Sequence, residues 1–324
     1  MLGSPATWKA RLRPKQAGPR LSSMASPEKI AVTGASGLVG SALVSELRRK
    51  GIDVVRLVRR APASNDEVRW DPEAGTIDAT GLGGITGAIH LAGDNIASGR
   101  WTEAKKASIR NSRVRGTEVL AHALARLSPK PRVFISASAI GYYGARGDQP
   151  VDESAAQGSG FLASVCGEWE AAADEARAAG IRVVHPRIGV VLASEGGALA
   201  KMKLPFLLGL GGPIGDGAQY MSWISLDDLV SALIFALGRE DLEGPVNFVS
   251  PTPVTNADFS ATLGRVLHRP AFLPVPKFAL RLGVGSEMAD EMLIGGVRVI
   301  PASLRAHGFQ WEHESLEPAL RSLL

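Results

Sequence analysis

The sequence predicts an α/β fold in which helices cover both faces of a parallel sheet. An apolar run at residues 30–33 is followed by a glycine turn and by apolar residues at helical spacing from Leu38 to Lys50. Short apolar runs and helical stretches then alternate as far as residue 184. Because this alternation produces a doubly wound parallel sheet, we expect a Rossmann fold with a smaller C-terminal lobe.

The expected elements follow this alternation in order. Strands are predicted at 54–58, 88–91, 133–136 and 181–184, and helices at 103–127 and 161–179, with a loop at 65–87 that carries a short hairpin around Trp70 and Ile77. Beyond Arg187 we expect a glycine-rich loop at 209–217 and helices at 227–237 and 256–267. The predicted domains are a disordered basic arm at 1–27, a Rossmann domain at 28–196 to which later segments return, and a smaller substrate lobe at 197–324.

The glycine turn has the spacing G-x-x-G-x-x-G. Glycines let the backbone approach a pyrophosphate, and the free N–H groups of the following helix attract its charge. A glycine triplet also serves tight turns, but a strand before it and a helix after it favour a dinucleotide. The residues expected to bind this cofactor are Gly34, Ser36, Gly37, Leu38, Val39 and Gly40.

The second strand ends in Arg59 and Arg60, where a site that prefers NAD would place an acidic residue against the ribose 2′-hydroxyl. Arginines at this position favour a 2′-phosphate, so the predicted cofactor is NADP. The alternative is that both are solvated charges at a strand end.

Ligands of such sheets bind beyond the carboxyl ends of the strands. Three strand ends should therefore face one crevice, and we expect cofactor contacts from Leu91, Ala92, Gly93, Asp94, Pro186 and Arg187. Asp94 either accepts a hydrogen bond from a ribose or only caps a turn. Arg113 and Arg187 either bind an anionic substrate or the cofactor, or act as plain salt-bridge partners.

The amino-acid composition indicates which classes of binding partner to expect. With 21% charged and 45% hydrophobic residues, the chain of 324 residues is typical of a soluble globular enzyme. Residues 1–23 hold five basic and no acidic residues, more than the net charge of +4 of the whole chain, so the body has no basic bias and nucleic acid is not an expected partner. No apolar stretch is long enough to span a bilayer, and no membrane partner is expected.

Cysteine and histidine usage bears on compartment and metal binding. Cys166 is the only cysteine, so no intrachain disulfide can form, which fits a reducing compartment. We expect a cytoplasmic protein, or one of an organelle stroma or matrix if residues 1–23 are a transit peptide. The six histidines form no metal-binding motif, and no metal is expected. His90, within an apolar strand, is interpreted as a core residue.

Several motifs together resemble a known superfamily. Residues 34–40, 90–93, 136–144 and 186–192 resemble those of the extended short-chain dehydrogenases and epimerases. Residues 196–199, 209–215 and 223–229 are similar to the atypical epimerase family branch, the YfcH-like proteins, and the likeness runs from about Lys29 to the family's small C-terminal domain. The resemblance implies an NADP-binding Rossmann domain, a second lobe over the nicotinamide, and an oxidoreductase activity without an assigned substrate.

One departure from the superfamily concerns catalysis. Its members use a serine and a Tyr-x-x-x-Lys pair, in which the lysine lowers the pKa of the phenol for proton exchange. This chain has no Tyr-x-x-x-Lys, and Phe161 and Val165 fall at the two positions. Ser138 matches the serine, and Tyr142 and Tyr143 follow it. These three are the catalytic candidates, with packing or turn formation as the alternative for the tyrosines.

The sequence is compatible with two functions. The first is an NADP-dependent oxidoreductase or epimerase-like enzyme that acts on a small carbonyl or hydroxyl compound. The second is a catalytically degenerate NADPH-binding sensor that acts through a partner, for example in division-related processes. The sequence predicts neither the substrate nor the oligomeric state.

Overall fold

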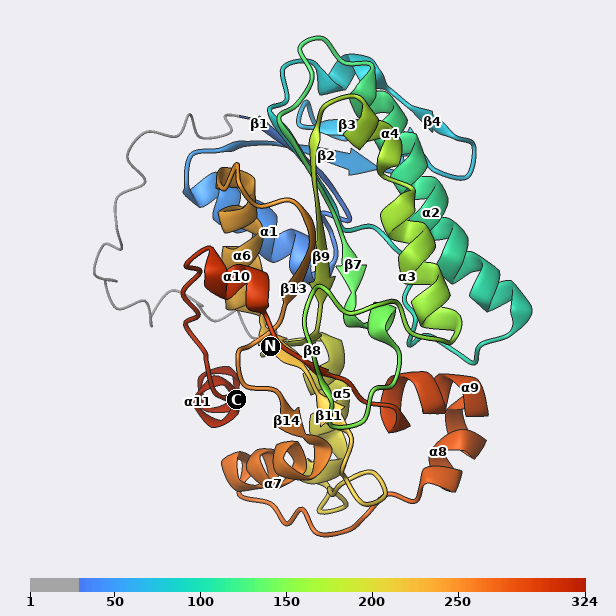
Figure 1. The fold of residues 1–324 in the computed structure, drawn as a ribbon, viewed down its shortest axis with the longest axis vertical. Coiled ribbons are helices and arrows are strands. Elements are labelled where there is room, and N and C mark those ends of the chain that lie inside the picture. The colour runs from blue at the N-terminus through green and yellow to red at the C-terminus, as the bar shows by residue number, and fades with distance from the viewer. Residues whose placement is uncertain (1–28) are drawn as a thin grey trace, which may run out of the picture.

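The computed structural model describes residues 29–324, and its centre is a nine-stranded sheet with β13-β9-β6-β5-β1-β2-β3-β4 in order and β7 paired with β9 (Figure 1). The predicted arm at 1–27, and with it the transit-peptide alternative, lies outside the described residues. The strands of this sheet are β1 (Lys29–Thr33), β2 (Asp53–Val58), β3 (Glu67–Asp71), β4 (Thr76–Ile77), β5 (Gly87–His90), β6 (Val133–Ser136), β7 (Ser138–Ala139), β9 (Arg182–Ile188) and β13 (Gly244–Phe248).

The strand order places a crevice at the centre of the sheet. β1 pairs in parallel with both β2 and β5, and all other pairs of this sheet are parallel except β3 with β4. The chain therefore winds outward in both directions from β1. In such sheets the carboxyl ends of the two central strands open the ligand crevice. The fold is a Rossmann fold, as predicted.

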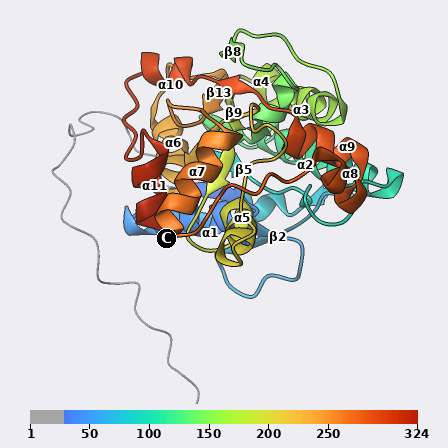
Figure 2. The same cartoon turned by 90° about the horizontal axis from the view of Figure 1, so that it is seen from below.

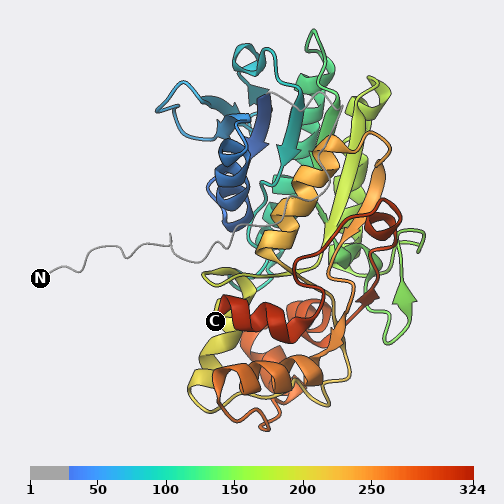
Figure 3. The same ribbon diagram turned by 90° about the vertical axis from the view of Figure 1, so that its left-hand side faces the viewer.

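Helices cover both faces of the sheet. α1 (Leu38–Arg49) and α6 (Leu226–Gly238) pack on one face, while α2 (Glu103–Ala125) and α4 (Asp174–Ala178) pack on the other, beside α3 (Phe161–Ala171) (Figure 3). Alternate residues of β1 serve the two layers: Ile30 and Val32 pack with α1 and α6, and Ala31 packs with α2. The alternation produces two apolar cores, which hold the crevice rigidly.

The smaller lobe lies beyond the carboxyl edge of the sheet. Its own core joins α5 (Gly197–Leu207), α7 (Asn256–Leu267) and α11 (Leu316–Leu323), while α8 (Lys277–Val284) and α9 (Ser286–Ala289) lie apart from them, near α2 and α3 (Figure 2). The remaining elements are η1 (Ala79–Leu82), η2 (Ile140–Tyr143), η3 (Asp290–Ile294), β8 (Pro150–Val151), β10 (Val190–Leu192), β11 (Tyr220–Met221), β12 (Trp223–Ser225), β14 (Val254–Thr255), β15 (Arg298–Val299) and α10 (Ala302–Ala306). The segment from β12 to β13 returns to the Rossmann part, since β13 is a strand of the main sheet.

The structure differs from the predicted elements in three places. The single helix predicted at 161–179 is two helices, because the chain turns at Ala172 and Ala173. No glycine or proline in the sequence marks this break. The short hairpin predicted around Trp70 and Ile77 is present as β3 and β4, but β3 also pairs in parallel with β2 and so extends the main sheet, which was not expected. The strand predicted at 181–184 continues to Ile188, so Pro186 and Arg187 lie within β9 and not after it.

Candidate cofactor and substrate site

The glycine turn between β1 and α1 is closely packed against its neighbours. Gly34 has φ +66°, and a Cβ there would lie 2.8 Å from the backbone carbon of Leu91. A Cβ on Gly40 would lie 2.1 Å from the carbonyl oxygen of Gly34. Gly37 precedes α1, and no side chain within residues 29–324 caps the first turn of that helix. Open amides at a helix N-terminus beside a glycine turn fit a pyrophosphate.

A cavity of about 820 Å³ starts beside this turn and runs between the sheet and the smaller lobe. Of the predicted site residues, those that line it are Val39, Leu91, Gly93, Asp94 and Ser138. The smaller lobe and the segment before β15 contribute Met202, Gln219, Met221, Met292, Leu293 and Val297. A long ligand seated at the glycine turn would therefore reach Ser138 without leaving the cavity.

The two arginines after β2 differ in their surroundings. Arg60 donates from Nη1 and Nη2 to the two carboxylate oxygens of Glu67, at 2.7 and 2.6 Å, and the Glu67 side chain is only 1% exposed. Arg59 is exposed and forms no ion pair with any residue from 29 to 324. Arg59 is thus the arginine left available for a phosphate, while Arg60 neutralises a buried carboxylate.

Ser138 belongs to a network of buried polar groups. Its Oγ donates to Oε1 of Glu170 at 2.7 Å, and Arg187 holds the same carboxylate from Nε and Nη2, both at 2.9 Å. Sequence reasoning missed Glu170, because its contact with Ser138 depends on how α3 packs against β7 and β9. The arrangement leaves the lone pairs of the Ser138 hydroxyl for a ligand in the cavity.

The tyrosines after Ser138 do not line the cavity. Tyr143 is 0% exposed, its hydroxyl donates to Oδ1 of Asn247 at 2.7 Å, and it accepts from Nη1 of Arg187 at 3.0 Å. Burial raises the pKa of the Tyr143 phenol. The guanidinium carbon of Arg187 lies 3.4 Å from the ring centroid of Tyr142. Ser138 is the one of the three catalytic candidates that the structure places at the cavity wall.

The same network accounts for the position of Arg187. Its side chain is buried behind Ser138 and is occupied by Glu170 and Tyr143. Pro186, also predicted to bind the cofactor, pairs with Val246 of β13 inside the sheet. Neither residue lines the cavity. Both make contacts inside the protein that stabilise β9 and its neighbours.

Helix α3 presents an apolar face where the superfamily pair would lie. Val165, at the lysine position, lines the cavity together with Cys166. Burial raises the pKa of the Cys166 thiol to about 12, so it stays protonated and is a poor nucleophile. Phe161, at the tyrosine position, packs against Trp101 with ring centroids 5.1 Å apart.

His90 holds the strand end beside the cavity. The backbone N–H groups of Leu91 and Ala92 donate to Oγ1 of Thr33 at 3.1 and 3.2 Å, which leaves the Thr33 hydrogen for Nδ1 of His90 at 2.7 Å. Burial lowers the pKa of His90 to about 3, so the ring is neutral. The role of His90 is structural, since it fixes the hydroxyl that orders the backbone after β5.

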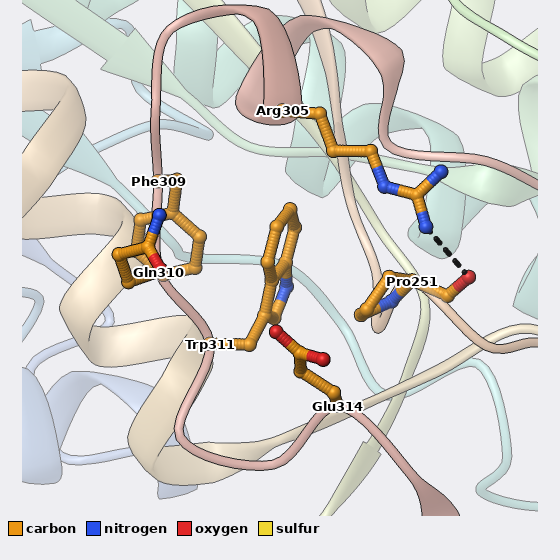
Figure 4. A pocket seen from close by; sticks show the side chains of 6 residues that line it. All are labelled: Pro251, Arg305, Phe309, Gln310, Trp311 and Glu314. Atoms are coloured by element: carbon orange, nitrogen blue, oxygen red, sulfur yellow. Dashed lines mark hydrogen bonds between the residues drawn. The ribbon is translucent and has the colours of Figure 1, made fainter.

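A second, smaller hollow of about 300 Å³ lies on the surface near α10 and is lined by Pro251, Arg305, Phe309, Gln310, Trp311 and Glu314 (Figure 4). Arg305 donates from Nη2 to the carbonyl oxygen of Pro251 at 3.2 Å. None of the predicted site residues lines this hollow. Within residues 29–324, no group of three or more His, Cys, Asp or Glu side chains could hold a metal ion, and no helix is long and apolar enough to cross a membrane.

The chain is similar to proteins of known families over most of its length. The model of the NAD dependent epimerase/dehydratase family matches residues 30–248, and a domain of unknown function, DUF1731, matches residues 275–323. An epimerase family protein of Mycobacterium tuberculosis is 47% identical over 90% of this chain and 96% of its own. An Arabidopsis thaliana relative, named as chloroplastic, is 36% identical over 91% of this chain and 86% of its own.

The chain is also similar to solved structures of epimerase family proteins. The crystal structure of the human epimerase family protein SDR39U1 with NADPH is 35% identical, has a TM-score of 0.83, and covers 91% of this chain and 98% of its own. The UDP-glucose 4-epimerase of Thermus thermophilus with NAD, at 19% identity and a TM-score of 0.70, shows the shared fold. The chain belongs to the NAD-dependent epimerase/dehydratase family, within the extended short-chain dehydrogenases, and carries the DUF1731 domain at its C-terminal end.

Proposed function

We propose that the protein binds NADP(H) and is an oxidoreductase or epimerase-like enzyme that acts on a small carbonyl or hydroxyl compound. The observation that carries this proposal is the single cavity that joins the glycine turn to Ser138, whose hydroxyl rests on the carboxylate of Glu170. The human relative crystallised with NADPH supports the choice of cofactor. Because the cavity extends from the glycine turn to the hydroxyl of Ser138, we favour the enzyme over the NADPH-binding sensor.

The cofactor would be held by the glycine turn and by the strand ends beside it. The open amides of α1 and the close backbone at Gly34, Gly37 and Gly40 suit the pyrophosphate. Exposed Arg59 suits the 2′-phosphate of the adenosine ribose. When bound, the nicotinamide supplies or accepts a hydride.

We assign the proton exchange to Ser138 and Glu170 in place of the missing Tyr-Lys pair. In the oxidation direction, the O–H bond of the substrate hydroxyl breaks and its proton passes to Oγ of Ser138, as the proton of Ser138 passes to Oε1 of Glu170. In the reduction direction both transfers reverse, and the proton returns to the substrate oxygen. Arg187 keeps the Glu170 carboxylate in place during these transfers.

Two measurements on the full chain test this proposal in turn. Calorimetric titration should show that NADPH binds more tightly than NADH, and ligands that copurify with the protein, identified by mass spectrometry, should direct the choice of carbonyl compounds to assay. Absence of NADPH binding would exclude the proposed function. Binding without turnover on any such compound would remove the enzymatic part of the proposal.

A further inference from the structure

Arg113 of α2 is a partly buried cation in the wall of the cavity, without an acidic partner. Its Nη1 donates to the carbonyl oxygens of Asp94 and Ile109, both at 3.0 Å. Across residues 29–324 it forms no salt bridge, and neither Nε nor Nη2 has an acceptor. Desolvation lowers the pKa of Arg113. The two unused nitrogens form one edge of the guanidinium, the edge that binds a carboxylate with two hydrogen bonds.

The acidic residues of the cavity wall are already engaged. Asp94 pairs with Nζ of Lys105 at 2.7 Å, and Asp290 pairs with Nη2 of Arg281 at 2.8 Å. Glu291 accepts from the backbone N–H groups that begin α3, at 2.7 and 2.8 Å. Among the described residues, Arg113 is the cation of the wall, and it forms no salt bridge with an acidic side chain. An uncompensated cation in a partly dry site is costly, and a bound anion would offset that cost.

A second donor without an acceptor lies beside Arg113. The guanidinium carbon is 5.1 Å from the ring centroid of Trp169, which also lines the cavity. The indole nitrogen of Trp169 is buried and has no hydrogen-bond partner among residues 29–324. Buried donors normally have a partner, so the unused edge of the Arg113 guanidinium indicates a ligand with acceptor oxygens.

The location of Arg113 separates it from the glycine turn. A Cβ on Gly93 would lie 3.2 Å from Cζ of Arg113, so the guanidinium packs closely on the chain just after β5. Trp169 lies one helical turn beyond Val165, the residue at the superfamily's lysine position. The hydrogen bonds and the ring contact of Arg113 thus run to Asp94, Ile109 and Trp169, and none runs to Gly34–Gly40, where the pyrophosphate is expected.

The rest of the cavity wall is mainly apolar and includes Ile96, Ile140, Leu162, Met202, Met221 and Leu293. We propose that Arg113 binds a carboxylate of the substrate, so that the substrate is a largely apolar carbonyl or hydroxy acid. This inference rests on the proposed function for the reaction itself, but the binding of the anion requires no turnover.

A matched pair of probes tests the proposal on the unmodified full chain. The protein, saturated with NADP⁺, is titrated by calorimetry with 4-phenylbutyrate and with 4-phenylbutyramide, which differ only in the charged group. We expect the carboxylate to bind at least about tenfold more tightly, the scale of one charge-assisted hydrogen bond. Equal affinities in the unmodified protein would overturn the proposal, whatever the variants do.

Variants then assign the preference to one side chain. Arg113→Met should abolish the preference for the carboxylate, and Arg113→Lys should keep part of it. Arg110→Met is the matched control, because Arg110 lies on the same helix but is exposed and pairs with Glu168. Melting curves check that each variant is folded. A preference that survives in folded Arg113→Met would contradict the proposal.

NADPH affinity, measured on the same variants, separates this inference from the proposed function. It should stay unchanged in Arg113→Met. A parallel loss of NADPH affinity would assign Arg113 to the cofactor and overturn its role toward the substrate. If the unmodified chain binds no NADPH, the proposed function fails, while the probe pair, titrated without cofactor, still decides whether Arg113 binds carboxylates.

Discussion

The hydroxyl of Ser138 donates to Oε1 of Glu170 across 2.7 Å, so its hydrogen points away from the cavity and its lone pairs point toward a ligand. A serine in this state accepts a hydrogen bond from a substrate hydroxyl. The carboxylate behind it is itself fixed by two hydrogen bonds from Arg187. In the proposed reaction, this arrangement supplies a route for a proton that involves no phenol.

Removal of either member of this pair should slow the reaction. Ser138→Ala and Glu170→Gln should each lower turnover by roughly 10²–10⁴, the usual contribution of a general acid or base, and leave NADPH affinity unchanged. The assay is the rate of NADPH oxidation with an identified carbonyl substrate. Ser164→Ala is the control, because Ser164 is an exposed serine of α3 that bonds Glu168. Normal turnover in both active-site variants would leave water or the substrate itself as the proton source.

Tyr143→Phe should lower stability more than it lowers turnover. The substitution leaves Nη1 of Arg187 and Oδ1 of Asn247 without their buried partner, which costs about 1–3 kcal/mol of unfolding free energy. Denaturant titration measures this loss. Tyr142→Phe is the matched control, since the Tyr142 hydroxyl makes no hydrogen bond within the described part of the chain, and its stability should be nearly unchanged. A large loss of turnover without loss of stability in Tyr143→Phe would restore the tyrosine as a catalytic residue.

Substitution of the two arginines after β2 should affect different properties: Arg59 the selectivity for NADPH, and Arg60 the stability of the fold. Arg59→Ala should cost about 1.5–3 kcal/mol of NADPH binding, the scale of a hydrogen bond to a charged group, and leave NADH binding nearly unchanged. Arg60→Ala should lower the melting temperature, because it removes one of the two cations that pair with buried Glu67, the other being Arg56. Calorimetry with both cofactors and melting curves on both variants distinguish the two roles. Equal affinity of the unmodified protein for NADPH and NADH would contradict the role of Arg59.

The central part of the fold was predictable because most of its strands and helices have a local signal. Strand β1, the glycine turn and helix α1 are adjacent in the sequence, and their order alone indicates a Rossmann fold. Strand β9 was predicted too short, since Pro186 cannot donate to a ladder and is uncommon inside a sheet. Local patterns therefore determine the architecture, but they miss strands that tolerate a proline.

The candidate site was only partly predictable, because its key contacts join distant segments. Ser138 and Glu170 are separated by 32 residues, and Tyr143 and Asn247 by 104. A short helical turn after Ser138 directs Tyr143 into the core and away from the cavity, and nothing in the local sequence shows that direction. The glycine motif could be recognised because the backbone itself forms it, whereas the polar network depends on tertiary packing.

Acid should destabilise the protein through His90. The imidazole has a pKa of about 3 in the folded chain against an ordinary value of 6.5, so below pH 6.5 the unfolded chain takes up a proton that the folded chain resists. This contribution to stability is fully present above pH 6.5 and is lost as the pH falls toward 3. Protonation would also place a hydrogen on Nδ1, which now accepts from Thr33.

A variant that cannot titrate isolates this effect. His90→Asn replaces the imidazole with an amide whose oxygen takes the place of Nδ1 as acceptor for Thr33, and it has no proton to gain in this range. Unfolding free energies are measured by denaturant titration at pH 7 and pH 5 for both proteins. The fall between the two pH values should be smaller in His90→Asn than in the unmodified chain, whatever the absolute stability of the variant. Equal falls would show that other groups, such as buried His185, whose pKa burial lowers to about 4, dominate the acid response.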